Sequence, residues 1–448
     1  MTKRGWLRIG AGAAAVAFVV AGVVLWRDHR ESLAKAALVA EIRAERAARP
    51  RPVLPAPTEE EVETARLYGE AVAAMRLDYS ETDYYDALDL VPWTSVPKAV
   101  EDVLAANADC LAIVDRATAR GACRFGVATT PGWSDRSLLA ALLEARGHAA
   151  LARGEAAAAA EEVRRLVRLG RDFGEAPRPG ESDWDGPWPG LHLVGAEQRA
   201  AKLLAALATA PGLSPEAVPS LLAAATADWR TAGANRRGID ENEDANDAAL
   251  LVMLGPEGQD RLDEADARMA QIREEFRKLS ASGSIVDEAK DKVREALRDR
   301  ASVPDAEGVR SFRALRAPVV AAVRRRDMVE LAPGGPHDAI GGLFGFMGPR
   351  WFRHCVANEA RIAVARTAAA VRAFQLREGR PPRDLGEVAP LLPPDVTLDP
   401  FDGKPLGYEV SGDGWRVSSR AWRQTRKNKD GTVETDPPVE VRFPRPAK

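Results

Sequence analysis

Hydrophobic residues near the amino terminus form one unbroken run. Residues 9–26 contain no charged side chain, whereas Lys3, Arg4 and Arg8 precede the run and Arg27 follows it directly. At about 1.5 Å of rise per residue, a helix of this length reaches about 27 Å, close to the thickness of the hydrocarbon core of a bilayer. The run therefore predicts a single membrane-spanning helix.

The basic flank predicts the orientation of this helix. Positively charged flanks stay on the cytoplasmic side, so we expect residues 1–8 to form a cytoplasmic tail and the chain after residue 26 to be exported to the periplasm or the cell exterior. A cleaved signal peptide is the alternative, but charged residues at 27–31 separate the apolar run from the nearest small-x-small site at residues 34–36. We expect an uncleaved, single-pass anchor in the inner (cytoplasmic) membrane.

The residues that follow predict a stalk, a linker and then a helical body. Residues 27–57 begin with helical spacing and end in four prolines within residues 50–57, a composition typical of a stiff extended spacer. Thr58 and Glu61 match a capping box, which predicts a helix running to about residue 75. A further amphipathic helix is predicted from Pro97 to near Gly121.

Two strong helical patterns, at residues 138–153 and 156–169, are separated by one turn at Gly154. They predict a helical hairpin. Gly147, Gly154 and Ala159 fall at the spacing of the small residues in a tetratricopeptide repeat, which this hairpin resembles. A single repeat cannot form a solenoid, so an ordinary hairpin of two helices remains the alternative. Residues 58–350 as a whole are predicted to be an all-helical exported body.

The pattern changes in residues 351–448, which predict a small α+β module. A long Ala- and Arg-rich helix covers residues 352–378, and apolar alternation marks short strands at residues 406–410, 414–418 and 439–443. The expected fold is therefore mainly α, with a long helix packed on a β-hairpin or small antiparallel sheet at the carboxyl end.

After the long helix, turn-forming and apolar residues stand in a fixed order at Gly379, Pro382, Leu385, Asp399, Pro400, Phe401, Gly403, Pro405 and Tyr408. In this order the module resembles the periplasmic domain of the major pseudopilin of type II secretion systems, a family in which the matching residues shape a loop and a hairpin that pack against the helix. The sequence departs from the family where Asp402 is inserted and where residues 418–420 replace the continuation that holds calcium. The whole layout is also similar to uncharacterised membrane-anchored bacterial proteins.

Composition and charge narrow the function without identifying it. The chain is 46% hydrophobic and has a formal net charge of -3, which argues against general nucleic-acid binding. Its three cysteines cannot form a disulfide framework for 448 residues. A bridge between Cys110 and Cys123 would require the chain to fold back.

No catalytic, cofactor or metal residue is predicted. The five histidines lack metal-ligand spacing, and the Ser95 to Lys98 match to S-x-x-K has none of its companion motifs. Cys355 follows His354 directly, so their side chains would point about 100° apart on a helix.

The leading hypothesis is a non-enzymatic interaction or scaffold protein of the cell envelope, anchored in the membrane and bound to an envelope protein. The alternatives are an accessory component of a type II secretion or pilus-like system, and a hydrolase with an unrecognised site.

Overall fold

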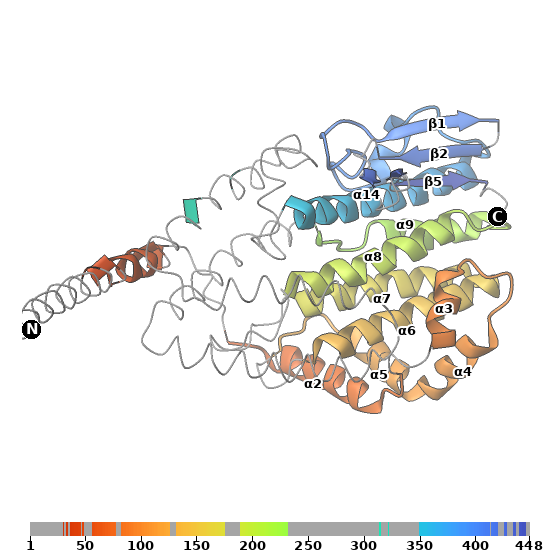
Figure 1. The fold of residues 1–448 in the computed structure, drawn as a ribbon. Coiled ribbons are helices and arrows are strands. Elements are labelled where there is room, and N and C mark those ends of the chain that lie inside the picture. The colour runs from red at the N-terminus through yellow and green to blue at the C-terminus, as the bar shows by residue number, and fades with distance from the viewer. Residues whose placement is uncertain are drawn as a thin grey trace, which may run out of the picture. The chain divides into compact units, whose positions relative to one another are not determined.

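A computed structural model describes most of the chain after residue 55 (Figure 1). The described residues are 56–77, 82–125, 131–174, 189–231, 349–412, 414–419, 425–427, 433–435 and 439–444, with parts of 30–48 and residues 313, 314 and 321. The chain divides into two compact units. The first contains Met1–Leu54 and Asp240–Val320, and the second contains Pro55–Ile239 and Ala321–Lys448.

In the first unit, the described residues between 30 and 48 are helical. Leu38 and Ile42, one turn apart, are fully buried, and Arg313 forms ion pairs with Glu41 and Glu45. Within the part of the chain that the structure describes, no helix is both long enough and apolar enough to span a bilayer. The run at residues 9–26 lies outside the described residues, so the membrane anchor stays a prediction.

The second unit begins with helix α2 (Glu59–Ala74), which starts at the predicted capping box. The Thr58 side chain accepts a hydrogen bond from the Glu61 amide, and the Glu61 carboxylate accepts one from the Thr58 amide. These two hydrogen bonds satisfy amide groups that a helix start leaves without partners. Helix α3 (Thr82–Asp89) follows α2.

The prediction of a single helix from Pro97 to near Gly121 is wrong. Two helices occupy this stretch, α4 (Lys98–Ala106) and α5 (Ala108–Thr118), and they meet at Asn107. The Asn107 side chain accepts a hydrogen bond from the amide of Arg76 and donates one to the carbonyl of Val103. A short polar side chain that competes for backbone groups in this way interrupts a helix. The cysteines of this region, Cys110 and Cys123, are buried free thiols, and no bridge joins them.

Helices α6 (Trp133–Ala152) and α7 (Ala156–Gly174) form the predicted hairpin, with Gly154 at φ +79° in the turn. Helix α8 (Pro189–Ala208) packs against both of them. A short 3-10 turn at Pro215–Ala217 then leads into α9 (Val218–Ala225).

The long helix α14 (Pro349–Glu378) lies alongside α8 and α9, with the strands on its other side (Figure 1). The strands form a three-stranded antiparallel sheet in the order β1 (Gly407–Ser411), β2 (Gly414–Ser418) and β5 (Glu440–Phe443). Strands β3 (Thr425–Lys427) and β4 (Val433–Thr435) pair separately. The chain is thus mainly helical with a small antiparallel sheet near its carboxyl end, as predicted.

The sheet is fastened to α14 by polar as well as apolar contacts. Trp415 of β2 is buried and donates a hydrogen bond from its indole nitrogen to Gln375 Oε1 at 3.1 Å. The Arg372 guanidinium lies over the Phe443 ring, 4.1 Å from its centroid. Since α14 contacts α8 and α9 as well, it joins the sheet to the helices of the second unit.

Candidate functional site

A groove of about 620 Å³ opens in the second unit between α6, α8, α14 and the start of β5. This volume is in the range of ligand-binding pockets in proteins. Small apolar side chains such as Ala140, Ala201 and Val364, which we call its floor, line the groove together with the Phe173 ring. Its charged lining residues are Arg136, Glu144, Arg199, Lys202, Arg361 and Glu440.

Glu144 is the most buried of these charged groups. Only 1% of its side chain is exposed, and it forms ion pairs with Arg199 and with Lys202, whose Nζ lies 3.1 Å from Glu144 Oε1. The Lys202 ammonium also donates to the carbonyl of Leu88 at 3.2 Å. A buried carboxylate is stable only when cations or donors compensate it. Here one carboxylate is shared by two cations on α8, so the groove wall keeps an excess of positive charge.

His148 lies one turn after Glu144 on α6, with Nε2 3.9 Å from Glu144 Oε1. Its ring packs against the Trp93 ring at a centroid distance of 5.9 Å and is 1% exposed. His148 does not line the groove. A general acid or base must reach the reacting atom, so this pair gives the hydrolase hypothesis no support.

Arg136 occupies a different electrostatic position. Its Nε donates to the Pro131 carbonyl at 2.7 Å, and its guanidinium carbon lies 5.5 Å from the centroid of the Phe173 ring. Among the described residues, no carboxylate forms an ion pair with it. Burial lowers the pKa of Arg136 to about 10, and the charge of Asp135 offsets this only in part. A half-buried cation of this kind would be stabilised by an anion entering the groove.

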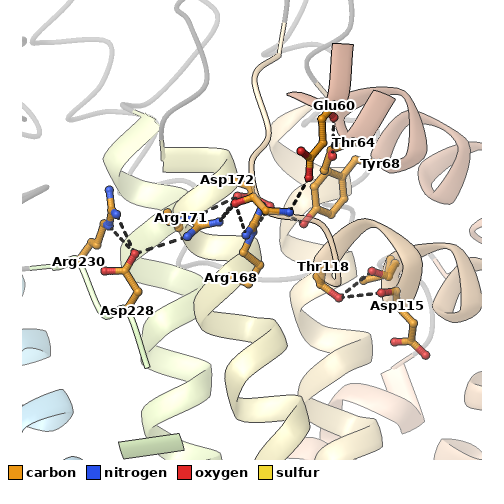
Figure 2. Close-up of polar contacts among 12 residues, drawn as sticks. Glu60, Thr64, Tyr68, Asp115, Thr118, Arg168, Arg171, Asp172, Asp228 and Arg230 are labelled. Carbon is orange, nitrogen blue, oxygen red and sulfur yellow. Dashed lines mark hydrogen bonds and ion pairs between the residues drawn. The ribbon is translucent and has the colours of Figure 1, made fainter. Parts of the chain in front are cut away.

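A second charged cluster surrounds Asp172 near the end of α7 (Figure 2). Asp172 accepts hydrogen bonds from the Tyr68 hydroxyl at 2.9 Å and from Arg168 Nε at 2.8 Å, while Arg171 lies 3.4 Å away. Burial is the main cause that raises the pKa of Asp172. Because the carboxylate is enclosed by groups of the protein itself, the cluster fits a structural role.

The same arginines connect distant segments. Arg168 and Arg171 both donate to the carbonyl of Gly121, and the amide of Gly121 donates to Glu60 of α2 (Figure 2). Burial raises the pKa of the neighbouring Cys123 thiol far above its usual value. A thiol held in its protonated form is a poor nucleophile, so this cluster links α2, the segment after α5 and α7 without offering a reactive group.

The residues predicted from the pseudopilin resemblance lie between the end of α14 and the start of β1. Asp399 is fully buried and accepts hydrogen bonds from the amide of Phe401 and from Ser419 Oγ at 2.8 Å. The Tyr408 hydroxyl donates to the carbonyl of Pro382 at 2.9 Å. Ser419 lies where the sequence departs from the family pattern, and its hydroxyl group binds the turn that begins at Asp399.

The other residues of this set have conformational or packing roles. Gly379 ends α14 at φ +70°, and Gly403 has φ +68° in the turn that follows Asp399. These are conformations that glycine adopts without strain. Leu385 is buried in the core, and Pro405 forms an isolated β-bridge with Leu398, while Pro400 follows Asp399 in the same turn.

The hairpin residues are placed as follows. Ala159 is buried on α7. At Gly147, an added Cβ would lie 2.2 Å from a methyl carbon of Leu203 and 3.2 Å from Glu162 Cβ. The closest approach to Gly147 therefore comes from α8, a third helix, whereas the hairpin prediction considered only α6 and α7.

The charged groups of the groove and the buried carboxylate Glu197 were not predicted from the sequence. Glu197 accepts hydrogen bonds from the amides of Arg230 and Thr231, and burial raises its pKa to about 7. The available signal was a lone acid within a long apolar helical pattern, as with Glu144 inside α6. Among the described residues, no three His, Cys, Asp or Glu side chains come together as a possible metal site.

Comparison with known proteins found no matching family model, no similar curated protein and no similar solved structure. The pseudopilin resemblance therefore stays a prediction.

Proposed function

We propose that this chain is an envelope interaction protein, anchored in the inner membrane by residues 9–26, whose groove in the second unit binds a partner protein. The observation that carries this proposal is Arg136, a half-buried cation that lines an open groove and has no carboxylate partner among the described residues. Keeping a charge partly dehydrated has a cost that an incoming anionic group would offset.

One feature of the groove lining is typical of protein-binding surfaces. Three arginines, Arg136, Arg199 and Arg361, line the groove beside small apolar side chains, and arginine is enriched where proteins meet. The anchor is supported by the uncharged run between basic flanks. It would hold the second unit at the membrane surface.

Cross-linking in intact cells tests this proposal. The tagged full chain should retain one envelope protein, and Arg361→Glu should reduce its recovery severalfold because the substitution reverses a charge at the groove rim. Arg164→Glu is the matched control, since Arg164 is an exposed arginine of α7 that pairs with Glu161 away from the groove. Equal recovery from both variants, or no retained protein at all, would remove the groove as the binding surface.

The location has its own test. Protease added to spheroplasts should digest the second unit of the membrane-bound chain, since the proposal places it outside the cytoplasm. Complete protection of the chain in spheroplasts, with digestion after lysis, would refute export.

A second candidate function is an accessory role in a type II secretion or pilus-like system. The closed turn around Asp399, together with the bond from Tyr408 to Pro382, favours it. Removal of the whole gene should then reduce secretion, and restoring the full chain should rescue it. Truncation before α14 is unsuitable because this helix packs against α8 and α9. Normal secretion without the gene would exclude this role.

A further inference from the structure

We infer that the occupant of the groove is an acidic, extended segment of the partner protein, which pairs with the outer edge of β5 and places a carboxylate against Arg136. The inference rests on the proposed function and names the chemistry of the partner.

The charge of the groove lining favours an anionic ligand. Four basic and two acidic side chains line the groove, which leaves a formal excess of two positive charges. Of the acids, Glu144 is shared between Arg199 and Lys202. Glu440 lies 3.5 Å from Arg416 and 3.1 Å from Arg442. Since both acids are engaged, a carboxylate from outside would meet cations.

The outer edge of β5 favours a ligand with an extended backbone. Among the described strands, β5 is an outer strand of the three-stranded sheet, and the amide of Ser419 donates to the carbonyl of Val439. Hydrogen-bonded pairs alternate along an antiparallel ladder, so Val439 and Val441 direct their backbone groups toward β2. Glu440, which lies between them and lines the groove, directs its amide and carbonyl away from β2. An outer edge of this kind accepts an additional strand.

These two observations coincide in space, because residues 439–441 and Arg136 line the same groove. A free phosphate or an anionic lipid headgroup would use the cations but would leave the strand edge and the apolar floor without contacts. An extended peptide that carries both acidic and apolar side chains would use all three, because its backbone can pair with the edge of β5 while its side chains contact the cations and the apolar residues.

Binding of labelled peptides to the purified full chain in detergent tests the inference. The probe is a short peptide in which aspartate alternates with valine, and the matched control carries asparagine instead of aspartate. We expect the aspartate peptide to bind at least about tenfold more tightly, because it gains charge-assisted hydrogen bonds. Equal binding of the two peptides would overturn the charge argument.

Two variants locate the contact. Arg136→Gln should weaken binding of the aspartate peptide about tenfold and leave the asparagine peptide unchanged. Arg361→Gln, at an exposed position on α14, should also weaken it and is a safeguard if the first variant melts early. Arg164→Gln should have no effect. If neither groove variant changes affinity, the peptide does not bind in the groove.

Backbone methylation separates strand pairing from simple charge attraction. Methylating alternate amides of the aspartate peptide removes main-chain donors while keeping every carboxylate, and it should abolish most of the binding. Undiminished binding would refute pairing with β5. Likewise, displacement of the peptide by millimolar inorganic phosphate, or selective binding of the chain to anionic over neutral lipid vesicles through Arg136, would assign the groove to a different anion.

The two proposals fail separately. A partner cross-linked through the groove in cells, together with no preference for acidic peptides, would leave the proposed function standing and remove only this inference. Tight binding of the acidic peptide, together with no cross-linked partner in cells, would support the chemistry inferred for the groove and remove the proposed envelope partner.

Discussion

Gly147 of α6 lies against side chains of two other helices, Leu203 of α8 and Glu162 of α7. Replacing it with Ala puts a methyl group 2.2 Å from a Leu203 methyl carbon and 3.2 Å from Glu162 Cβ. Leu203 is fully buried and has little room to move. We expect Gly147→Ala to lower the free energy of unfolding by up to about 2 kcal/mol, which is the overpacking cost of about 1 to 3 kcal/mol less the gain in helix propensity of about 1 kcal/mol.

The control is Gly69→Ala in α2, where an added Cβ meets no atom within 4 Å. It should stabilise the chain by up to about 1 kcal/mol. Urea unfolding of the two variants measures both values. A stabilising Gly147→Ala would show that the three helices are less tightly packed than described.

Glu197 should make stability depend on pH. Burial raises its pKa to about 7 in the folded chain, from an ordinary value of 4.5. The folded state therefore keeps a proton that the unfolded state releases, so this contribution to stability is complete below about pH 4.5 and is lost as the pH rises to about 7. The expected loss is about 3 kcal/mol.

Comparison with Glu197→Gln isolates this contribution, because other buried acids such as Asp172 and Glu162 act equally in both proteins. Urea unfolding between pH 4.5 and 8 should give a flatter stability profile for the variant. Parallel profiles would show that Glu197 titrates at the same pH whether or not the chain is folded.

Among the elements, the turn that begins at Asp399 is held by a side-chain hydrogen bond from Ser419, the residue that follows β2. Ser419 Oγ donates to the buried carboxylate of Asp399 at 2.8 Å. We expect Ser419→Ala to lower the free energy of unfolding by about 1 to 3 kcal/mol, because one hydrogen bond to a buried charged group is lost. Ser411→Ala, at an exposed position of β1, is the matched control and should change it by less than about 0.5 kcal/mol.

Thermal unfolding of both serine variants measures this difference. Equal melting temperatures would mean that the turn does not depend on Ser419.

Local signals account for the elements that could be predicted. The capping box at Thr58, the turn at Gly154 and the end of α14 at Gly379 each depend on residues adjacent in sequence, and the structure has them where expected. The break at Asn107 could not be read locally, since its side chain binds the amide of Arg76, which lies 31 residues earlier.

The groove could not be predicted either, because its residues are far apart in the sequence. Arg136, Arg199, Arg361 and Glu440 come from four elements that are far apart in the chain. Each charge alone resembles an ordinary surface residue, and only the packing of α6, α8 and α14 brings them together. Sequence periodicity indicates which face of a helix is buried, but not which other helix covers it.

In the whole molecule, a predicted membrane anchor precedes the second unit, which carries a basic groove. The groove lies between the helices and the sheet, so its shape depends on α14 holding both together. Substitutions that loosen the packing of α14 should therefore weaken partner binding together with stability, whereas Arg361→Gln should affect binding alone.

The most direct test places a photoactivatable cross-linking amino acid at Gln198, an exposed residue that lines the groove. Illumination of intact cells should attach one envelope protein to the full chain at this position, and Arg136→Gln in the same chain should reduce the yield severalfold. The control position is Val62, an exposed residue of α2 outside the groove, which should give no such product. The same product at both positions, or none at Gln198, would contradict the claim that the groove is where a partner binds.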